Sequence, residues 1–555
     1  MSADLVIRGG TVIDGTGRPP RRADVAVRRG RIDAVEEPSR LTGEQTIDAS
    51  GCVVAPGFID VHTHYDAQVF WDPWLTPSAF HGVTTVIAGN CGFSLAPVRP
   101  TGVELLAETL QHVEDMSVDT LRVGVPWHEF EDFASYLDAI ERRGAALNFG
   151  CYVGHTAVRL YEMGDDAYER AATEAEVLAM RSTVAGALRA GAVGFATSSS
   201  PTHNGDKGRP VPSRLADVAE LQALLEPLRD AGRGVAALLP GGAIKHREMF
   251  ELQRQIRRPF TWTALLTMKG HPYHEEVMAE HDAARAQGVE LWPQVSCRPL
   301  VFQMNLAEPF MFNMRSSFAR LLGKPRAERI AAYRDVQWRA VALAELEARG
   351  AFRVKWEALT VAESDTRPDL IGRRVVDLAA DSPQSPLDVM LDVSLADDLR
   401  TRFSSVIAND DLEGIAWLLP RDGVLFGLAD SGAHVSQLCD ACFATDLLGA
   451  WVRDRAVMPL ERAVHKLTAE PARFFGLTDR GTLEPGKAAD VVVFDPDTIG
   501  AGPLRRLRDF PADGERLTAD APTGMVHTLV NGTPIRLDTE MVTAALDRHP
   551  GTIIR

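Results

Sequence analysis

The stretch Gly57–His64, which reads GFIDVHTH, decides how the rest of the chain is interpreted. It follows the apolar run GCVVAPG and predicts a buried strand. Side chains two positions apart on a strand point to the same face, so His62 and His64 project together near the strand's carboxyl end. Two imidazoles placed in this way can bind one metal ion from one side. The alternative is a pair of histidines in a polar loop.

Seven further apolar runs follow this stretch, with helical patterns between most of them. The eight predicted strands are Phe58–His64, Thr84–Ala88, Leu147–Val153, Val193–Thr197, Gly234–Leu239, Thr261–Thr267, Val289–Val295 and Val424–Asp430. Strands that alternate with helices form a parallel sheet, and eight such units predict an α/β fold of the (β/α)₈ TIM-barrel type over residues 56–479. The active site of such a barrel lies at the carboxyl ends of its strands.

The two ends of the chain differ from its middle. Residues 1–55 and 480–555 contain short runs of period two, punctuated by Gly and Pro, and predict one small discontinuous β-sandwich built from both termini. The gap between the seventh and eighth predicted strands spans about 130 residues, against ~30 for a typical βα unit. We therefore expect residues 300–422 to form an insertion that covers the barrel mouth as a lid.

Composition narrows the class of protein and its partners. The chain has 555 residues, a formal net charge of −17 and 45% hydrophobic residues. The negative charge argues against nucleic acid or an anionic membrane as partner. No apolar run reaches the length of about 18 residues that a membrane span needs, and no signal peptide is evident. Six cysteines are too few for a disulfide scaffold. We expect a cytoplasmic protein that binds a small molecule, and a homo-oligomer is compatible with the sequence.

Five motifs make the chain resemble the amidohydrolase superfamily and, more closely, the N-acyl-D-amino-acid deacylase (D-aminoacylase) family. They are GFIDVHTHYD (57–66), GVTTVIAGNCG (Gly82–Gly92), GHTAVR (Gly154–Arg159), GLADSGAH (Gly427–His434) and LTAEPARFFGLTDRGTLEPGKAADVVVFDP (Leu467–Pro496). The resemblance covers nearly the whole chain. It implies a metal-dependent hydrolase that cleaves an amide C–N bond in a small molecule.

The resemblance also assigns roles to two further residues. Cys91, between glycines in GNCG, corresponds to a family cysteine that binds the metal, and a thiolate is a good zinc ligand. The alternative is a buried, inert cysteine. Asp430 corresponds to an aspartate that contacts the metal and carries the proton from the attacking water to the leaving amine. Its alternative role is to cap the following helix.

The family pattern is incomplete at the predicted fifth and sixth strands. Family members place a histidine at the end of each, and here Leu239 or Pro240 and Thr267 or Met268 stand near those positions. The nearest histidines, His246 and His271, lie several residues further along the chain. His62, His64, Cys91 and Asp430 remain as metal ligands. They predict one Zn²⁺, with a second metal uncertain.

The residues that bind substrate in the family are also not all present in this sequence. Family members carry an arginine shortly after the eighth-strand aspartate to bind the substrate carboxylate, but residues 431–452 contain none. Arg159, Lys269, Arg298 and the run Arg209–Arg214 (RPVPSR) are candidate replacements, because cationic groups bind a carboxylate and a guanidinium binds it with two hydrogen bonds. For the arginines, an ordinary surface position is the alternative. Lys269 matches a family lysine that follows the sixth-strand histidine. Such a lysine binds an anionic group of the substrate or, as the alternative, is simply solvated.

Three histidines follow predicted strands and are further substrate-binding candidates. They are His155, His203 and His434, in loops where barrel enzymes place functional residues. Simple hydrogen bonding within the loops is the alternative for each.

Two other functions fit the same barrel. The missing histidines make a mononuclear deaminase or a metal-dependent decarboxylase an alternative to the amidohydrolase. A metal-free binding protein is the third hypothesis. Retention of His62, His64, Cys91 and Asp430 argues against it, because a binding protein needs no such set of donors.

Overall fold

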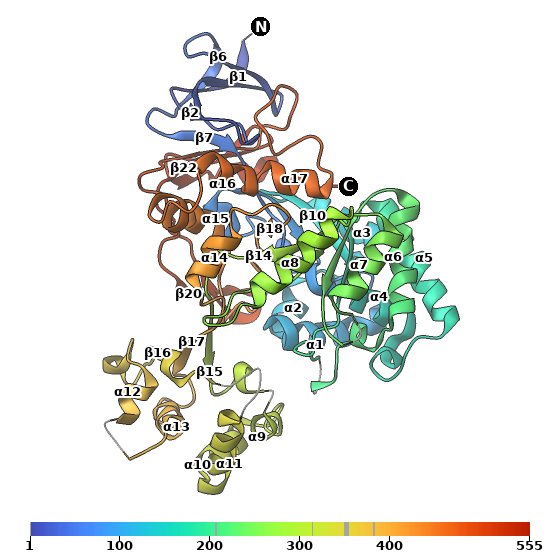
Figure 1. The fold of residues 1–555 in the computed structure, drawn as a ribbon, viewed down its shortest axis with the longest axis vertical. Coiled ribbons are helices and arrows are strands. Elements are labelled where there is room, and N and C mark those ends of the chain that lie inside the picture. Colours follow the sequence, from blue (N-terminus) through green and yellow to red (C-terminus); the bar gives the residue numbers. More distant parts are fainter. Residues whose placement is uncertain (1, 206–207, 243, 314, 349–353, 381–382) are drawn as a thin grey trace.

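An eight-stranded parallel sheet forms the centre of the molecule (Figure 1). The structure is a computed structural model that describes residues 2–205, 208–242, 244–313, 315–348, 354–380 and 383–555. The strand order of the eight-stranded sheet is β18-β14-β13-β12-β11-β10-β9-β8. The strands are β8 (Phe58–Asp60), β9 (Val83–Ala88), β10 (Asn148–Gly154), β11 (Gly194–Ser198), β12 (Val235–Leu239), β13 (Phe260–Trp262), β14 (Leu291–Val295) and β18 (Leu425–Phe426). Each overlaps one of the eight predicted strands, although β8, β13 and β18 are shorter than predicted.

The two edges of this sheet meet. Beyond β8, Thr63 forms a parallel bridge with Ser431, which follows β18. The His64 N–H donates to the Ser431 carbonyl at 2.6 Å, and the Thr63 N–H donates to the Ile87 carbonyl at 3.0 Å. The sheet is therefore curled, and the ends of its first and last strands lie side by side.

Helices separate most of these strands along the chain and lie against the sheet (Figure 1). They are α1 (Val103–Glu114), α2 (Val118–Gly124), α3 (Phe133–Arg143), α4 (His155–Met163), α5 (Glu174–Ala190), α6 (Val218–Ala231), α7 (His246–Ile256), α8 (Tyr273–Ala286), α15 (Phe443–Asp446), α16 (Leu460–Leu467) and α17 (Ala469–Phe475). Asp132 and Thr173 close capping boxes at the starts of α3 and α5, which satisfies N–H groups that a helix cannot pair internally. One large apolar cluster joins these helices to the sheet.

Strands from both ends of the chain share a second, seven-stranded sheet of order β24-β23-β22-β19-β7-β2-β3. Its members are β2 (Thr11–Val12), β3 (Arg21–Arg22), β7 (Val53–Pro56), β19 (Val491–Phe494), β22 (Met525–Val530), β23 (Thr533–Leu537) and β24 (Glu540–Met541). A four-stranded sheet holds β1 (Ala3–Arg8), β4 (Asp24–Arg28), β5 (Arg31–Glu36) and β6 (Gly43–Asp48). Leu5, Val25 and Val491 belong to one buried cluster that contains residues of both sheets.

The segment between β14 and β18 has its own sheet and core. Its strands are β15 (Leu300–Asn305), β16 (Leu359–Glu363) and β17 (Arg402–Ala408), and its helices are α9 (Ser316–Ala319), α10 (Arg326–Arg334), α11 (Val336–Glu347), α12 (Val375–Ala380), α13 (Pro386–Ala396) and α14 (Leu412–Leu418). Phe318, Tyr333 and Phe403 belong to a buried cluster separate from the main core. This segment lies at the opposite end of the molecule from the terminal sheets (Figure 1).

A hairpin near the C-terminus leaves the terminal sheets. Its strands β20 (Arg505–Phe510) and β21 (Gly514–Thr518) pair only with each other among the described residues. The Leu517 N–H donates to the Val435 carbonyl at 2.7 Å, so the hairpin is bound to the loop that follows β18. Within the described ranges, no helix is both long enough and apolar enough to cross a membrane.

Candidate metal centre

Two histidines and an aspartate converge where the first and last strands meet. His62 Nε2 lies 3.4 Å and His64 Nε2 3.3 Å from Asp430 Oδ1. Burial raises the pKa of Asp430, but hydrogen bonds and charge from the two histidines outweigh it and hold the pKa well below its usual range. Asp430 is therefore a carboxylate at neutral pH.

Cys91 joins this group from the loop after β9. Its Sγ lies 3.7 Å from His62 Nε2. Donor atoms of His62, His64 and Cys91 all lie within 4.8 Å of one another, the only such group of three His, Cys, Asp or Glu residues found in the described part of the chain. The sequence analysis predicted that these three and Asp430 act together, and the structure brings all four together.

His62 is held by its second ring nitrogen. Nδ1 lies 2.6 Å from Gln294 Oε1, at the end of β14, and 3.2 Å from Thr263 Oγ1, just beyond β13. Because an amide oxygen only accepts hydrogen bonds, Nδ1 carries a proton, and Nε2 is the atom that would bind a metal ion in place of its contact with Asp430. A carbonyl acceptor behind a histidine is the usual partner of a metal-binding imidazole.

The backbone of the Cys91 loop is fixed by a buried aspartate. Gly89 has φ +77°, and a Cβ there would lie 2.5 Å from the Tyr152 carbonyl oxygen, so this turn requires glycine. The Gly89 N–H donates to Asp66 Oδ2 at 2.9 Å. Burial raises the pKa of Asp66 to about 7. The turn holds Cys91 beside His62.

Three residues of the site have left-handed backbone conformations. The φ angles are +55° at Cys91, +52° at Asp430 and +47° at His434. Residues other than glycine rarely adopt this left-handed backbone conformation. Where they do, interactions with the surrounding structure compensate the strain. Such residues cluster at functional sites, so their concentration here supports a functional role.

A buried glutamate, Glu114, faces the group from the end of α1. Its Oε1 lies 3.4 Å from His64 Nδ1, and its side chain is 6% exposed. Burial, then the charges of Asp430 and Asp66, raise its pKa well above the usual range. Burial, Asp430 and Glu114 also raise the pKa of the Cys91 thiol. A cation bound among these groups would reverse both shifts, because it favours their charged forms.

Two predicted histidines lie at the edge of the site. His434 Nε2 is 3.9 Å from Asp430 Oδ2, and its ring packs at 5.1 Å from that of Phe302 in β15. His203 Nδ1 bonds Ser198 Oγ at 2.8 Å. Burial and the charges of His434 and His64 lower the pKa of His203 to about 3, which makes it neutral at pH 7.

The opposite side of the strand ends contains no imidazole at the predicted positions. β12 ends at Leu239, and Thr263, not Thr267, is the residue after β13 that faces His62. His246 begins α7 and packs against the Trp262 ring at 4.7 Å, while His271 is exposed in a turn. Neither histidine returns to the site.

Two of the predicted substrate-binding residues belong to a buried network. His155 Nε2 bonds Glu220 Oε1 at 2.9 Å and its Nδ1 bonds Thr197 Oγ1 at 2.7 Å. Arg159 is fully buried, and its NH1 lies 2.5 and 2.6 Å from the two Glu220 oxygens. The structure therefore gives both residues internal partners and does not bring them into the metal centre.

Arg298 and Lys269, two further candidates, have other partners. Arg298 Nε donates to Asp440 Oδ1 at 2.7 Å and NH1 donates to Asp446 Oδ1 at 3.1 Å, which neutralises its charge. Lys269 has an exposed side chain, and its backbone N–H donates to Asp410 Oδ1 at 2.9 Å.

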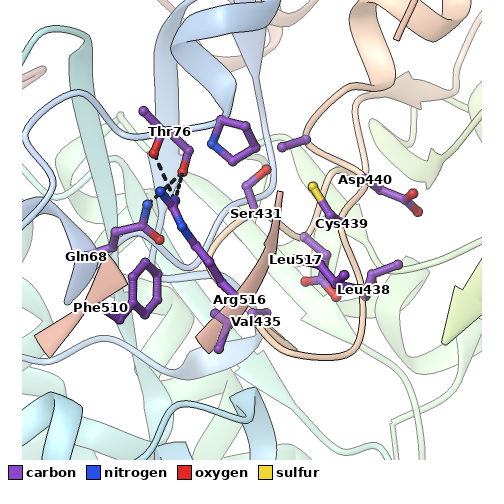
Figure 2. A pocket seen from close by; sticks show the side chains of 15 residues that line it. Gln68, Thr76, Ser431, Val435, Leu438, Cys439, Asp440, Phe510, Arg516 and Leu517 are labelled. Carbon is purple, nitrogen blue, oxygen red and sulfur yellow. Dashed lines mark hydrogen bonds between the residues drawn. The ribbon is translucent and has the colours of Figure 1, made fainter. Parts of the chain in front are cut away.

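A small cavity lies behind the loop that carries Asp430 (Figure 2). Its volume of about 20 Å³ has room for a water molecule and not for a substrate. Arg516 of β21 reaches into it, and its NH1 donates to the carbonyl and hydroxyl oxygens of Thr76 at 3.0 and 2.8 Å. Arg516 Nε and NH2 bond both oxygens of Asp509. The cavity is part of the contact between the hairpin and the sheet.

Sequence reasoning missed Glu114, Gln294 and Thr263. The sequence contained a signal for Gln294, because it is a lone polar residue near the carboxyl end of an apolar strand. In a barrel of this type, the carboxyl ends of the strands carry the functional residues. Glu114 is one of several acidic residues on α1, and nothing local distinguishes it.

The fold and the site together define an α/β enzyme with a candidate metal centre at the carboxyl ends of its parallel strands. Comparison with known proteins then identifies the family. The model of the amidohydrolase family matches residues 45–536. This chain belongs to the amidohydrolase family, and it is a hydrolase acting on carbon–nitrogen bonds.

Three similar proteins illustrate the relationship. The D-aminoacylase of Alcaligenes xylosoxydans xylosoxydans is 30% identical, with 96% of this chain and 94% of that protein covered. The N-acyl-D-glutamate deacylase of the same organism is 31% identical, with coverage of 100% and 96%. The crystal structure of N-acyl-D-glutamate deacylase from Bordetella bronchiseptica, complexed with zinc and a phosphonate inhibitor that mimics the tetrahedral intermediate, has a TM-score of 0.67, 27% identity and full coverage of both chains.

Proposed function

We propose that this amidohydrolase removes the acyl group from N-acyl-D-amino acids and uses a single metal ion. The observation that carries the proposal is the convergence of His62, His64 and Cys91, with donor atoms within 4.8 Å of one another, on Asp430. The substrate class is inferred from the names of two relatives, a D-aminoacylase and an N-acyl-D-glutamate deacylase. Both match this chain along most of their length.

The donors fit a metal ion. Two imidazoles, a thiol and a carboxylate suit Zn²⁺, which accepts nitrogen, sulfur and oxygen ligands. His62 has its Nδ1 proton bound by Gln294, so its Nε2 is free to coordinate. When bound, the metal would polarise the substrate carbonyl and lower the pKa of its water to about 7.

Asp430 is the proposed proton carrier. Its low pKa keeps it charged at neutral pH, so it can accept the proton of the attacking water. The oxygen of that water bonds to the amide carbon. As the C–N bond breaks, Asp430 returns the proton to the amine nitrogen, and the products are a carboxylic acid and an amine.

Glu114 and Gln294 are proposed positioning residues. Each faces the Nδ1 atom of one histidine, at 3.4 Å for Glu114 with His64 and 2.6 Å for Gln294 with His62. The hydrogen bond to Gln294 holds a proton on His62 Nδ1 and fixes that ring, and the Glu114 carboxyl group, close to His64 Nδ1 without a hydrogen bond to it, would favour a proton on that atom.

A mononuclear site is proposed because one set of donors is missing. Leu239 ends β12 and Thr263 follows β13, and neither supplies an imidazole. Among the residues that the structure describes, no second group of three donors accompanies the first.

We further propose the division predicted from the sequence, in which residues 300–422 act as a lid on the barrel of residues 56–479, and residues 1–55 and 480–555 form the β-sandwich. Two contacts support the lid. Phe302 packs on the ring of His434, and the Gln303 N–H donates to the Gln437 carbonyl at 2.8 Å. Both contacts join the insertion to the loop that follows Asp430.

The test is a product assay with purified protein on paired D- and L-enantiomers of N-acetyl amino acids. We expect acetate and free amino acid from the D-substrates, with at least tenfold lower kcat/KM for the L-forms. Release of ammonia would indicate a deaminase. Release of carbon dioxide would indicate a decarboxylase, and no turnover of any N-acyl amino acid would refute the proposal.

A further inference from the structure

The loop after β11 reaches the metal centre through His203. This loop joins β11 to α6 and therefore lies at the carboxyl end of its strand, as the metal centre does. The His203 ring packs 5.2 Å from that of Phe93, two residues beyond Cys91. The charges of His64, His434 and Asp430 all act on His203, so this residue borders the site.

An arginine of the same loop, Arg214, is held directly beside His203. Its NH1 donates to the His203 carbonyl oxygen at 3.0 Å and to Asn204 Oδ1 at 2.6 Å. Its backbone N–H donates to the Val211 carbonyl at 2.9 Å, which fixes the turn that carries it. Arg214 is half-buried, and burial lowers its pKa. The guanidinium is thus positioned by neutral oxygen atoms, and among the described residues no carboxylate pairs with it.

Arg214 differs in this from two other arginines near the strand ends. Arg159 is paired with Glu220, and Arg298 with Asp440. Within the described ranges, no carboxylate oxygen lies within 4.0 Å of the Arg214 guanidinium, and its Nε and NH2 make no hydrogen bond. A cation withdrawn from water without a counter-charge is unfavourable, so such a group is expected to gain an anionic partner.

The free edge of Arg214 suits a particular ligand chemistry. Nε and NH2 of a guanidinium form a planar fork that binds the two oxygens of a carboxylate with two parallel hydrogen bonds. Arg516 cannot serve in this way, because Nε and NH2 already bind Asp509. Its NH1 donates to Thr76 (Figure 2). His203 is neutral at pH 7, so of these two neighbouring side chains it is Arg214 that carries a positive charge.

We propose that Arg214 binds the carboxylate of the substrate and is the residue that selects N-acyl amino acids over neutral amides. The inference rests on the proposed function, which supplies the amide substrate, and adds the residue that recognises its anionic end. In this arrangement the carboxylate lies beside the loop after β11, and the scissile amide lies over His62, His64 and Asp430.

The test compares Arg214→Met and Arg214→Lys with the wild type on N-acetyl-D-alanine and on its uncharged carboxamide. Loss of hydrogen bonds to a charged group predicts a kcat/KM lower by about 10- to 100-fold for the acid in Arg214→Met. For the carboxamide, kcat/KM for cleavage of the N-acetyl amide bond should change less than twofold. This result would also show that the variant is folded. Arg214→Lys should give an intermediate loss, because a lysine retains the charge without the fork.

Arg209→Met is the matched control. Arg209 lies in the same loop, but it is paired with Glu169 and stacks on Tyr168, so both substrates should be hydrolysed as in the wild type. Equal losses for acid and carboxamide in Arg214→Met, or no loss for either, would overturn the inference.

A binding measurement separates this inference from the proposed function. Calorimetric titration of the metal-loaded protein with N-acetyl-D-alanine should give a Kd that is about 10- to 100-fold weaker in Arg214→Met than in the wild type, whether or not the ligand is hydrolysed. An unchanged Kd, or no binding to the wild type, would refute the role of Arg214. Binding through Arg214 without turnover would refute the proposed function alone.

Discussion

Two sides of the same ring of strand ends carry different chemistry. On the side of β8, β9 and β18, His62, His64, Cys91 and Asp430 converge with donor distances of 3.3 to 3.7 Å. On the side of β12 and β13 the sheet is formed just as regularly, yet Leu239 and other non-ligating residues stand at the strand ends. The parallel sheet supplies equivalent positions, and the residue at each position decides whether a metal can bind.

The largest expected effect follows from removing a histidine on the first side. His62→Ala should lower kcat/KM on N-acyl amino acids by at least about 10³-fold, because the activated water depends on the metal. The variant should also lose bound zinc, measured by elemental analysis of the purified protein. His271→Ala is the matched control, since His271 is exposed in the turn after β13 and should leave both quantities unchanged.

A different outcome would reverse the comparison between the two sides. Loss of metal in His271→Ala, with retention in His62→Ala, would mean that the β13 side holds the ion.

The next effect concerns the residue behind His64. Glu114→Gln should weaken zinc affinity by about 10- to 100-fold, measured by competition with a chelator, because an amide lacks the negative charge that a carboxylate would place beside the metal-bound His64. Glu114→Asp should recover part of the loss. Glu108→Gln, on the same helix, should bind zinc as the wild type does. Wild-type affinity in Glu114→Gln would show that the glutamate only fills space.

A smaller effect, on stability alone, is expected at Glu220. Burial raises its pKa, but His155 and Arg159 outweigh burial and lower the pKa to about 2. A carboxylate with a depressed folded-state pKa stabilises the fold above its unfolded-state pKa of about 4.5, and this stabilisation is lost as pH falls towards 2. Glu220→Gln should therefore reduce the unfolding free energy by about 3 kcal/mol at pH 7, measured by urea unfolding.

The pH dependence and the metal content test this assignment. The difference between Glu220→Gln and the wild type should shrink below about pH 4.5, and zinc content should stay unchanged at pH 7. A loss of zinc in Glu220→Gln would show that His155 and Arg159 contribute to the metal site and not only to the stability of the fold.

The smallest effect is expected at Lys269. Its side chain is exposed, and only its backbone N–H contacts Asp410. Lys269→Ala should change kcat/KM by less than about twofold, within the usual range for surface substitutions. A tenfold rise in KM would show that Lys269 reaches the substrate, as the family resemblance implies.

The sequence predicted the central sheet well, because its strands are short apolar runs that are buried on both faces. β9 is buried at every position, and such a run is visible in sequence alone. Strand ends were less predictable. Phe58–His64 was predicted as one strand, but regular pairing ends at Asp60, after which Thr63 pairs with both Ile87 and Ser431. The hairpin of β20 and β21 was not predicted, since its place depends on contacts with a loop far away in the chain.

The candidate site divides in the same way. Residues within motifs or at strand ends, such as His62 and Asp430, could be predicted because their positions follow from strand geometry. Glu114 could not, because a helix and a strand bring it to His64 from 50 positions away. Nor could the internal pairing of Arg159 with Glu220, which joins α4 to the start of α6 across 61 positions of the chain.

The most direct test of the account is the number of metal ions per chain, determined by elemental analysis after expression with added zinc. We expect one equivalent of zinc, which falls below one-tenth in His62→Ala. Less than one-tenth of an equivalent in the wild type would contradict the metal-dependent mechanism. Two full equivalents would contradict the difference between the two sides of the strand ends.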